Sequence, residues 1–316
     1  MKEYKYRPFT FFALTFAFTW GLWIAAIFAG EELSLTFASL GLFVPATVAF
    51  TMVMTSKSRA LKDDYKRKFF GLASIKPLNI LLSVVLFFII ILVSILISLL
   101  FGQSTDQFSI SGGFSFSVGG MPTLFLIILT ALLEELGWRG YAEDAIASGC
   151  TWFKESVIFG IVWALWHFPL LFIPGMYHYN ILHMNPLFAL NFFISVMPLG
   201  FLFTWVYVKS GRSIFACMIF HFFVNFLQEQ IAITQFTKCI ETFVLIAAAI
   251  IVVLTNKDLF FEKRHIGNIL SEDKQANMVA VIAEKTDLAL EDCEKVLTAF
   301  EEVAGKGLAD KLKFFK

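Results

Sequence analysis

The chain has 316 residues, of which 58% are hydrophobic, 16% are charged and 39 are phenylalanine. Soluble globular domains carry about 25% charged residues, so the composition excludes an ordinary soluble protein and indicates an all-α, polytopic membrane protein. The formal net charge of +0 gives no reason to expect a nucleic-acid partner. The four cysteines show neither paired nor metal-type spacing, so we expect neither a disulfide framework nor a cysteine zinc site.

Apolar runs long enough to cross about 30 Å of hydrocarbon predict the transmembrane helices. Eight such runs lie at residues 9–29, 35–55, 77–101, 121–146, 153–174, 186–208, 213–233 and 238–255. The first run is longer than a signal-peptide core, so we expect a retained helix rather than a cleaved leader.

Lysine and arginine concentrate in alternate turns between these runs. The basic turns hold Lys57, Arg59, Lys62, Lys66, Arg67, Lys68, Lys76, Lys154, Lys209 and Arg212. The intervening turns at 30–34, 102–120 and 175–185 hold neither lysine nor arginine. The positive-inside rule therefore predicts a multi-pass cell-membrane protein with both termini in the cytoplasm.

The composition changes to a charged segment after Thr255. We therefore expect two domains, a membrane domain at 1–256 and a small cytoplasmic helical tail at 257–316. Apolar positions at helical spacing predict two short amphipathic helices in the tail. These positions are Met278, Val279, Ile282 and Ala283, then Cys293, Val296, Leu297, Phe300 and Val303. So small a unit buries little surface alone, which favours helix pairing or self-association.

The fourth apolar run contains three ionisable residues, Glu134, Glu135 and Arg139. Charges at this depth are costly unless they face a polar cavity or a partner. Neighbouring residues on a helix point about 100° apart, so the two glutamates should have different roles. Glu135 and Arg139 have the i,i+4 spacing of a helical ion pair, which leaves Glu134 to face a cavity and activate water. The alternative is a purely structural salt bridge.

Two further polar motifs interrupt apolar segments, His167 in the fifth and His221 with Asn225 in the seventh. At about 1.5 Å per residue, Glu134, His167 and His221 lie roughly 20, 21 and 14 Å from the cytoplasmic ends of their helices. One cavity could therefore contain all three. His221 and Asn225 share a helix face and could form an oxyanion hole or a weak metal site; the alternative is an interhelical hydrogen bond.

The other polar residues are weaker candidates for catalysis. We expect His178 and His183 to be solvated in an external turn. We expect Glu143, Asp144 and Glu229 to lie at helix ends near the membrane surface, where charge is tolerated.

These motifs resemble those of the CPBP family, the CAAX proteases and bacteriocin-processing enzymes also called the Abi family. The segment from Glu134 to Arg139 matches E-E-x-x-x-R, His167 matches the histidine of F-x-x-x-H, and His221 to Asn225 matches H-x-x-x-N. The resemblance covers residues 120–230. The departure is Trp163, where the family usually has phenylalanine; this exchange of one aromatic residue for another leaves the resemblance intact.

The resemblance implies an intramembrane endopeptidase that cuts near the C-terminus of prenylated or other membrane-associated proteins or peptides. Glu134 and His167 would activate the water, and His221 and Asn225 would stabilise the oxyanion. Glu135 and Arg139 would support them. Glu134, His167 and His221 could alternatively be zinc ligands, since the family is commonly labelled as metalloprotease, and the sequence leaves this open.

Two other functions remain open at this stage. One is a non-catalytic membrane protein, such as a bacteriocin-immunity factor or scaffold, and the other is a proton-coupled transporter, which the absence of inverted-repeat signals disfavours. The segment 275–300 also resembles the helical half of HU-type proteins. Because the β-arms that grip DNA are missing, this resemblance implies helix pairing but no nucleic-acid binding.

Overall fold

The computed structural model describes residues 4–70, 77–111, 113, 123–262 and scattered positions between 282 and 296. Within these residues every regular element is a helix, with one isolated β-bridge between Ile110 and Ile231. The chain divides into two compact units, and the unit Tyr6–Arg264 contains the helices discussed below. Most of the predicted tail, including Met278, Leu297 and Val303, lies outside the described residues.

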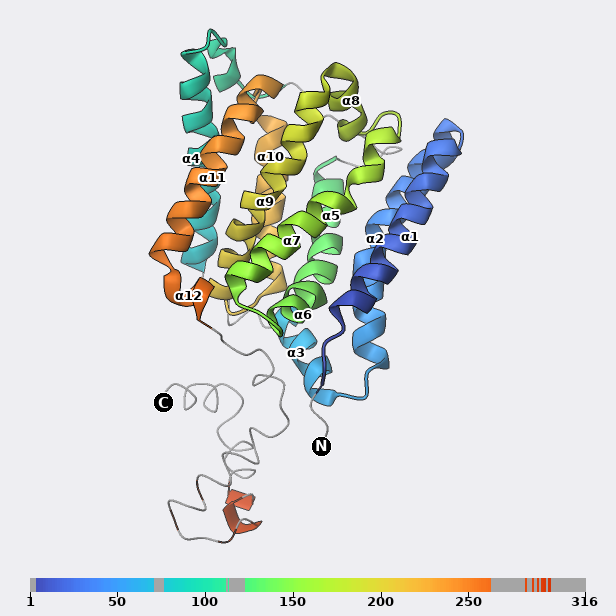
Figure 1. Cartoon of the computed structure of the whole chain (residues 1–316), viewed down its shortest axis with the longest axis vertical. Helices are drawn as coiled ribbons and strands as arrows, with labels where there is room; N and C mark the ends of the chain where they lie inside the picture. Colours follow the sequence, from blue (N-terminus) through green and yellow to red (C-terminus); the bar gives the residue numbers. More distant parts are fainter. Residues whose placement is uncertain are drawn as a thin grey trace. The chain divides into compact units, whose positions relative to one another are not determined.

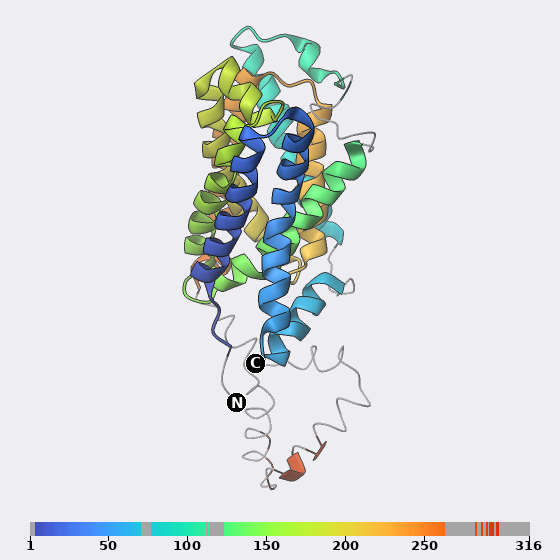
Figure 2. The same cartoon turned by 90° about the vertical axis from the view of Figure 1, so that its right-hand side faces the viewer.

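The long helices lie side by side, as Figures 1 and 2 show from two directions. α1 packs against α2, α2 against α5, α5 against α10, α7 against α9, and α9 and α4 against α11. The α-helices are α1 Pro8–Phe28, α2 Glu31–Thr55, α3 Arg59–Phe70, α4 Pro77–Leu99, α5 Thr123–Gly137, α6 Glu143–Ala147, α7 Trp152–Trp166, α8 Tyr177–Met184, α9 Pro186–Lys209, α10 Ile214–Gln230, α11 Gln235–Thr255 and α12 Lys257–Phe261. The 3₁₀ helices are η2 Thr105–Phe108 and η4 Phe168–Phe172, and η3 Trp138–Ala142 is a π-helix.

Six helical segments of the described chain are long and apolar enough to cross a membrane. They are Pro8–Phe28, Leu33–Thr55, Pro77–Leu99, Trp152–Phe172, Pro186–Lys209 and Gln235–Thr255. The protein is therefore an integral, multi-pass, all-helical membrane protein. The fourth and seventh runs of the sequence prediction correspond to α5 and α10, which have only 15 and 17 residues. The count of eight spans stays a prediction.

The fourth predicted segment, 121–146, is not one continuous helix. α5 ends at Gly137, the π-helix follows at Trp138–Ala142, and α6 begins at Glu143. A π-turn inserts one residue into a helix and is found frequently at functional sites. It frees backbone carbonyls from the α-helical pattern, and the carbonyls of Arg139 and Gly140 accept bonds from Lys68 Nζ at 3.1 and 2.6 Å.

Gly137 allows α5 to approach α2 closely at the end of α5. A Cβ atom added at Gly137 would lie 2.5 Å from Pro45 Cβ and 2.6 Å from the Pro45 carbonyl carbon. The second of these is a backbone atom, so no side-chain rotation could relieve the clash. Membrane helices use small residues in this way to bring backbones together. The glycine inside the Glu134 to Arg139 motif thus has a packing role.

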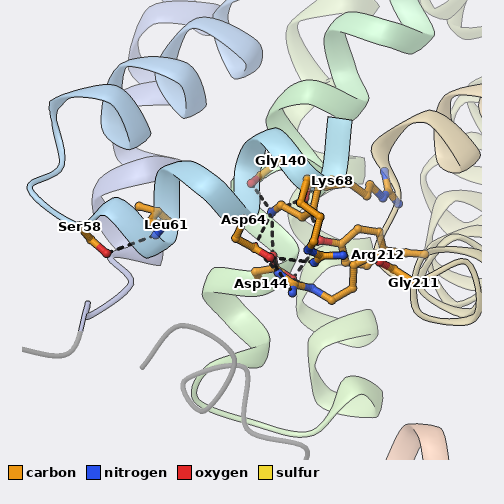
Figure 3. A network of polar contacts seen from close by, with 11 residues as sticks. Ser58, Leu61, Asp64, Lys68, Gly140, Asp144, Gly211 and Arg212 are labelled. Carbon is orange, nitrogen blue, oxygen red and sulfur yellow. Dashed lines mark hydrogen bonds and ion pairs between the residues drawn. The ribbon is translucent and has the colours of Figure 1, made fainter. Parts of the chain in front are cut away.

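A buried ion cluster joins α3 to α6 and to the turn between α9 and α10 (Figure 3). Arg212 Nη2 lies 2.7 Å from Asp64 Oδ2 and is also bonded to Asp144, and Lys68 Nζ lies 2.8 Å from Asp144 Oδ2. Tyr207 Oη donates to Asp144 Oδ1 at 3.0 Å. Since each charge has a partner of opposite sign, the cluster can be buried without an isolated charge.

This cluster corrects the expected placement of several charges. Lys68 and Arg212 are counted above as residues of cytoplasmic turns, yet their exposures are 1% and 7%. Asp144 and Glu143 are expected near the membrane surface, yet both are fully buried. A residue count cannot tell a solvated lysine from one paired in the interior, so Lys68 and Arg212 carry little weight for orientation. The cytoplasmic location of the termini stays a prediction.

Replacing Gly137 by alanine should destabilise the fold. Gly137→Ala forces a methyl group against the Pro45 backbone and is expected to lower the free energy of unfolding by about 1–3 kcal/mol, measured by thermal unfolding in detergent. Gly21→Ala is the matched control, because a Cβ at this helical position meets nothing within 4 Å. Equal melting temperatures for both variants would show that the close contact has no energetic importance.

The ion cluster should make stability sensitive to acid. Burial alone raises the pKa of Asp64, but Arg212, Lys68 and Arg67 lower it more, so the folded-state pKa lies well below the usual value of about 3.9. A group with a depressed folded-state pKa stabilises the fold above its unfolded-state pKa, and this stability is lost as the pH falls from about 4 toward the folded-state pKa. Asp64→Asn should therefore lower the melting temperature at pH 7 and reduce its decline in acid.

The neighbouring Asp63→Asn variant provides the comparison for this measurement. The Asp63 carboxylate is 54% exposed and pairs with Arg59 at 3.7 Å. Exposed pairs contribute little to stability, so Asp63→Asn should unfold like the wild type from pH 7 to pH 3. If Asp64→Asn also unfolded like the wild type from pH 7 to pH 3, the ion cluster would not contribute to the stability of the fold.

Candidate active site

Two indole groups hold one oxygen of Glu134. Glu134 Oε2 accepts hydrogen bonds from Trp138 Nε1 at 3.2 Å and from Trp163 Nε1 at 2.9 Å. Trp138 is four residues further along the same chain segment, whereas Trp163 comes from α7. These bonds orient the carboxyl group and leave Oε1 as the oxygen available to a water molecule.

His167 lies at the point where α7 ends and the 3₁₀ helix η4 begins. Its Nδ1 is 2.7 Å from the carbonyl oxygen of Trp163. A carbonyl oxygen only accepts, so Nδ1 carries the hydrogen, and in the neutral ring Nε2 carries the lone pair. Pro169, in the first turn of η4, cannot donate to a carbonyl of the preceding turn. The Trp166 carbonyl instead accepts from Trp20 Nε1 at 3.2 Å.

Glu135 connects Arg139 with His221. Arg139 Nη1 lies 2.9 Å from Glu135 Oε2, so the ion pair expected from the i,i+4 spacing is present. Glu135 makes a second contact that the sequence does not indicate: His221 Nδ1 donates to Glu135 Oε1 at 2.8 Å. Because the carboxylate takes Nδ1, the other nitrogen of His221, Nε2, remains for a ligand.

The guanidinium of Arg139 is fully buried between aromatic rings. Its Cζ lies 4.7 Å from the centre of the Phe159 ring and 4.4 Å from that of Phe203. It also faces a second carboxylate, with Nε 3.4 Å from Glu143 Oε1. Ring faces and carboxylates replace the water that the cation loses on burial, so Arg139 can hold Glu135 in the protein interior.

Trp163 brings the three motifs together. Its indole donates to Glu134, and its ring centre lies 6.0 Å from that of His167 and 5.7 Å from that of His221. Phenylalanine, which the family usually has at this position, has no N–H to donate, so Trp163 adds a hydrogen bond to Glu134 that phenylalanine could not make.

A cavity of about 360 Å³ contains the polar constellation. Glu134, His167, His221 and Asn225 all line it, so the structure brings all four candidate residues to one space. The volume is within the range of small-molecule and peptide subsites. The lining continues to α8 and to the beginning of α11, at the end of the bundle opposite α3 and α6 (Figure 1).

His178 is a cavity residue that sequence reasoning missed. The ring of His178 stacks on that of His167, with centres 5.5 Å apart and planes 27° apart, and it packs edge-on against Phe192. Burial, and then the nearby His167, lower the pKa of His178 well below its ordinary value. His178 is thus a neutral imidazole in the cavity wall, not the solvated residue expected above. Its neighbour His183 is exposed, as expected.

The donor arrangement does not fit the zinc site that the sequence left open. Among the described residues, no group of three or more His, Cys, Asp or Glu side chains could hold a metal ion. Hydrogen bonds orient the three side chains: indole N–H groups hold Glu134 Oε2, and a carbonyl and a carboxylate accept from the Nδ1 atoms of His167 and His221. The polar atoms left open on Glu134 and the two histidines suit a bound water and a substrate carbonyl.

Comparisons with known proteins agree with this geometry. The family described as type II CAAX prenyl endopeptidase Rce1-like matches residues 120–227, which include all four candidate residues. The chain is 42% identical over 272 residues to CAAX prenyl protease 2 of Methanococcus maripaludis. This alignment covers 83% of the present chain and 99% of that relative.

The helical membrane fold and these similarities together define an intramembrane endopeptidase of the CAAX type. The chain belongs to the Rce1-like family of type II CAAX prenyl endopeptidases. This identification favours an enzyme over the scaffold and transporter considered above.

Replacing Trp163 by phenylalanine should impair catalysis more than stability. Trp163→Phe keeps an aromatic ring against the two histidines but removes the donor to Glu134. A hydrogen bond to a charged group contributes about 1.5–3 kcal/mol, so we expect kcat/KM to fall roughly 10- to 100-fold, measured on a peptide substrate in detergent.

Trp205→Phe is the matched control, since the buried Trp205 Nε1 has no hydrogen-bond partner among the described residues. It should retain wild-type kcat/KM. If Trp163→Phe were equally active, the indole would not be needed to orient Glu134.

Proposed function

We propose that Glu134 and His167 activate the water that attacks the scissile peptide bond. The proposal is supported by their positions in one cavity and by two atoms, Oε1 of Glu134 and Nε2 of His167, that make no hydrogen bond to the residues that the structure describes. A water between them would give its proton to Glu134 as the hydroxide attacks the carbonyl carbon. Glu134 would then transfer this proton to the leaving amine, as general acid–base catalysis requires.

The developing oxyanion would be stabilised by His221 and Asn225. Glu135 accepts from Nδ1 of His221 and orients the ring, so that an Nε2–H group would donate to the oxyanion. Asn225 is one helical turn further along α10, and its side-chain NH₂ supplies a second donor. Arg139 would act through Glu135 and not touch the substrate. The contacts of Trp163 with all three motifs are the observation that carries this assignment.

We propose as substrates membrane-associated proteins or peptides with a prenylated C-terminal CAAX sequence, the class that the name of the Methanococcus relative indicates. The largely apolar cavity within a membrane-spanning bundle suits a substrate whose lipid stays in the bilayer. The proposal includes eight spanning segments, with α5 and α10 crossing as shorter helices, and both termini in the cytoplasm. Self-association through the tail at 257–316 is a separate hypothesis.

Isosteric replacement of Glu134 should abolish cleavage without unfolding the protein. Glu134→Gln keeps an acceptor for the indoles but cannot accept the proton of water, and general acid–base groups contribute about 10²- to 10⁴-fold. His167→Ala and His221→Ala should cause losses of similar size. The assay incubates purified enzyme with a prenylated peptide ending in a CAAX sequence and identifies the released fragment by mass spectrometry.

Glu262→Gln, at an exposed carboxylate outside the cavity, is the control and should cleave normally. Thermal unfolding of each variant separates lost chemistry from lost structure. Normal cleavage by well-folded Glu134→Gln would overturn the proposed mechanism. Inactive variants that also fail to fold would instead indicate that the polar constellation serves packing.

A further inference from the structure

The helix α3 carries a basic face that the proposed mechanism does not use. The exposed or half-buried cations of this helix and of the turn before it are Lys57, Arg59, Lys62, Lys66 and Arg67. Among the described residues of this face Asp63 is the one acid, and it pairs with Arg59 at 3.7 Å. The face therefore carries a clear excess of positive charge.

α3 lies at one surface of the membrane domain. It connects α2 with α4, and segments of both helices, Leu33–Thr55 and Pro77–Leu99, are long and apolar enough to cross a membrane. The chain between two consecutive spans lies at one face of the bilayer, where the lipid headgroups are found. Figures 1 and 2 show α3 at the end of the bundle where α2 ends. The helix is therefore within reach of the headgroups.

The two faces of α3 have different surroundings. Leu61 and Tyr65 are buried, and Tyr65 packs so closely on the π-helix that a Cβ added at Gly140 would lie 2.8 Å from Tyr65 Cε2. Lys62 and Lys66, at i and i+4, lie on the side that does not pack on the bundle. An amphipathic helix with a cationic polar face at a membrane surface is the pattern of an interfacial, lipid-binding helix.

The two central lysines of the basic face are not neutralised by the protein. In the described part of the chain, the residues of α3 that form ion pairs through a basic group are Arg59, Arg67 and Lys68. Lys62 and Lys66 form none there. Like charges at i and i+4 repel each other, so an anion placed beside both ammonium groups would relieve the repulsion.

The basic surface continues to the turn after α9 and has an apolar group at its end. Arg67 Nη1 donates to the Gly211 carbonyl at 3.1 Å, and Lys209, two residues earlier, is exposed. At the end of α3, Phe70 is 72% exposed, and its ring packs edge-on against Phe69 with the centres 4.7 Å apart. Cations beside an exposed aromatic ring match a phospholipid, which offers both a phosphate and an acyl chain.

We propose that the basic face of α3 binds anionic phospholipids, with Lys62 and Lys66 on the phosphate and Phe70 against the acyl chains. The inference is independent of the peptidase chemistry. It also connects the lipid to the site, because Lys68 on the buried face of α3 donates to the carbonyls of Arg139 and Gly140. A lipid that holds α3 in place thereby stabilises the π-helix that carries Arg139.

The test measures lipid binding to the full chain in a neutral detergent by native mass spectrometry. The probes are phosphatidylglycerol and phosphatidylcholine with the same acyl chains, and the wild type should bind phosphatidylglycerol more tightly. Each cation near an anionic lipid surface contributes about fivefold in affinity. Lys62→Gln/Lys66→Gln should therefore bind phosphatidylglycerol roughly 25-fold more weakly and phosphatidylcholine as before.

Lys154→Gln/Lys257→Gln is the matched control, since it removes the same charge from exposed lysines outside α3 and should keep wild-type binding. Thermal unfolding gives a second measurement. Because a ligand of the folded state stabilises it by mass action, phosphatidylglycerol should raise the melting temperature of the wild type and of the control more than that of Lys62→Gln/Lys66→Gln.

Four results would overturn the inference. These are equal binding of the two lipids by the wild type, equal losses in the two double variants, and displacement of the lipid by inorganic phosphate, which would indicate a site for small anions. The fourth is a Lys62→Gln/Lys66→Gln variant that changes the fraction of dimers but not the bound lipid, which would show that a second copy of the chain covers this face.

Discussion

The ion pair between Glu135 and Arg139 is the interaction on which the rest of the site depends. Both side chains are completely buried, and either charge alone would be costly at that depth. Arg139 fixes Glu135, Glu135 fixes the ring of His221, and the aromatic rings around Arg139 exclude water from the pair. A contact between the end of α5 and the π-helix thereby orients His221, a candidate catalytic residue on α10.

Much of the site could be predicted from the sequence because polar residues are rare in membrane-spanning segments. Glu134, His167, His221 and Asn225 are conspicuous in apolar runs, and all of them line the cavity. The Glu135 to Arg139 contact follows from helical spacing alone. The fourth and seventh runs, which carry the glutamate pair and the His221 motif, form the short helices α5 and α10. The cost of burying charge thus indicated, from the sequence alone, residues that the structure places around one cavity.

Contacts between residues distant in sequence could not be predicted in the same way. No local pattern indicates that Trp163 donates to Glu134, that His178 turns back onto His167, or that Lys68 reaches the carbonyls of Arg139 and Gly140. Hydropathy treats Lys68 and Asp144 as surface charges, since it contains no information about their partners. The π-turn also escaped prediction, because its residues are compatible with an ordinary helix.

The wide turn at Trp138–Ala142 allows one segment of chain to serve two separate purposes. Each residue added to or removed from a helix rotates everything beyond it by about 100°. Before the turn, Glu134 lines the cavity and Glu135 contacts His221; after it, Asp144 belongs to the ion cluster that holds α3. Removing one residue from this π-helix would leave Glu134 at the cavity but rotate Asp144 away from Lys68 and Arg212. The extra residue of the π-helix therefore sets the rotation between the candidate active site and the buried ion cluster.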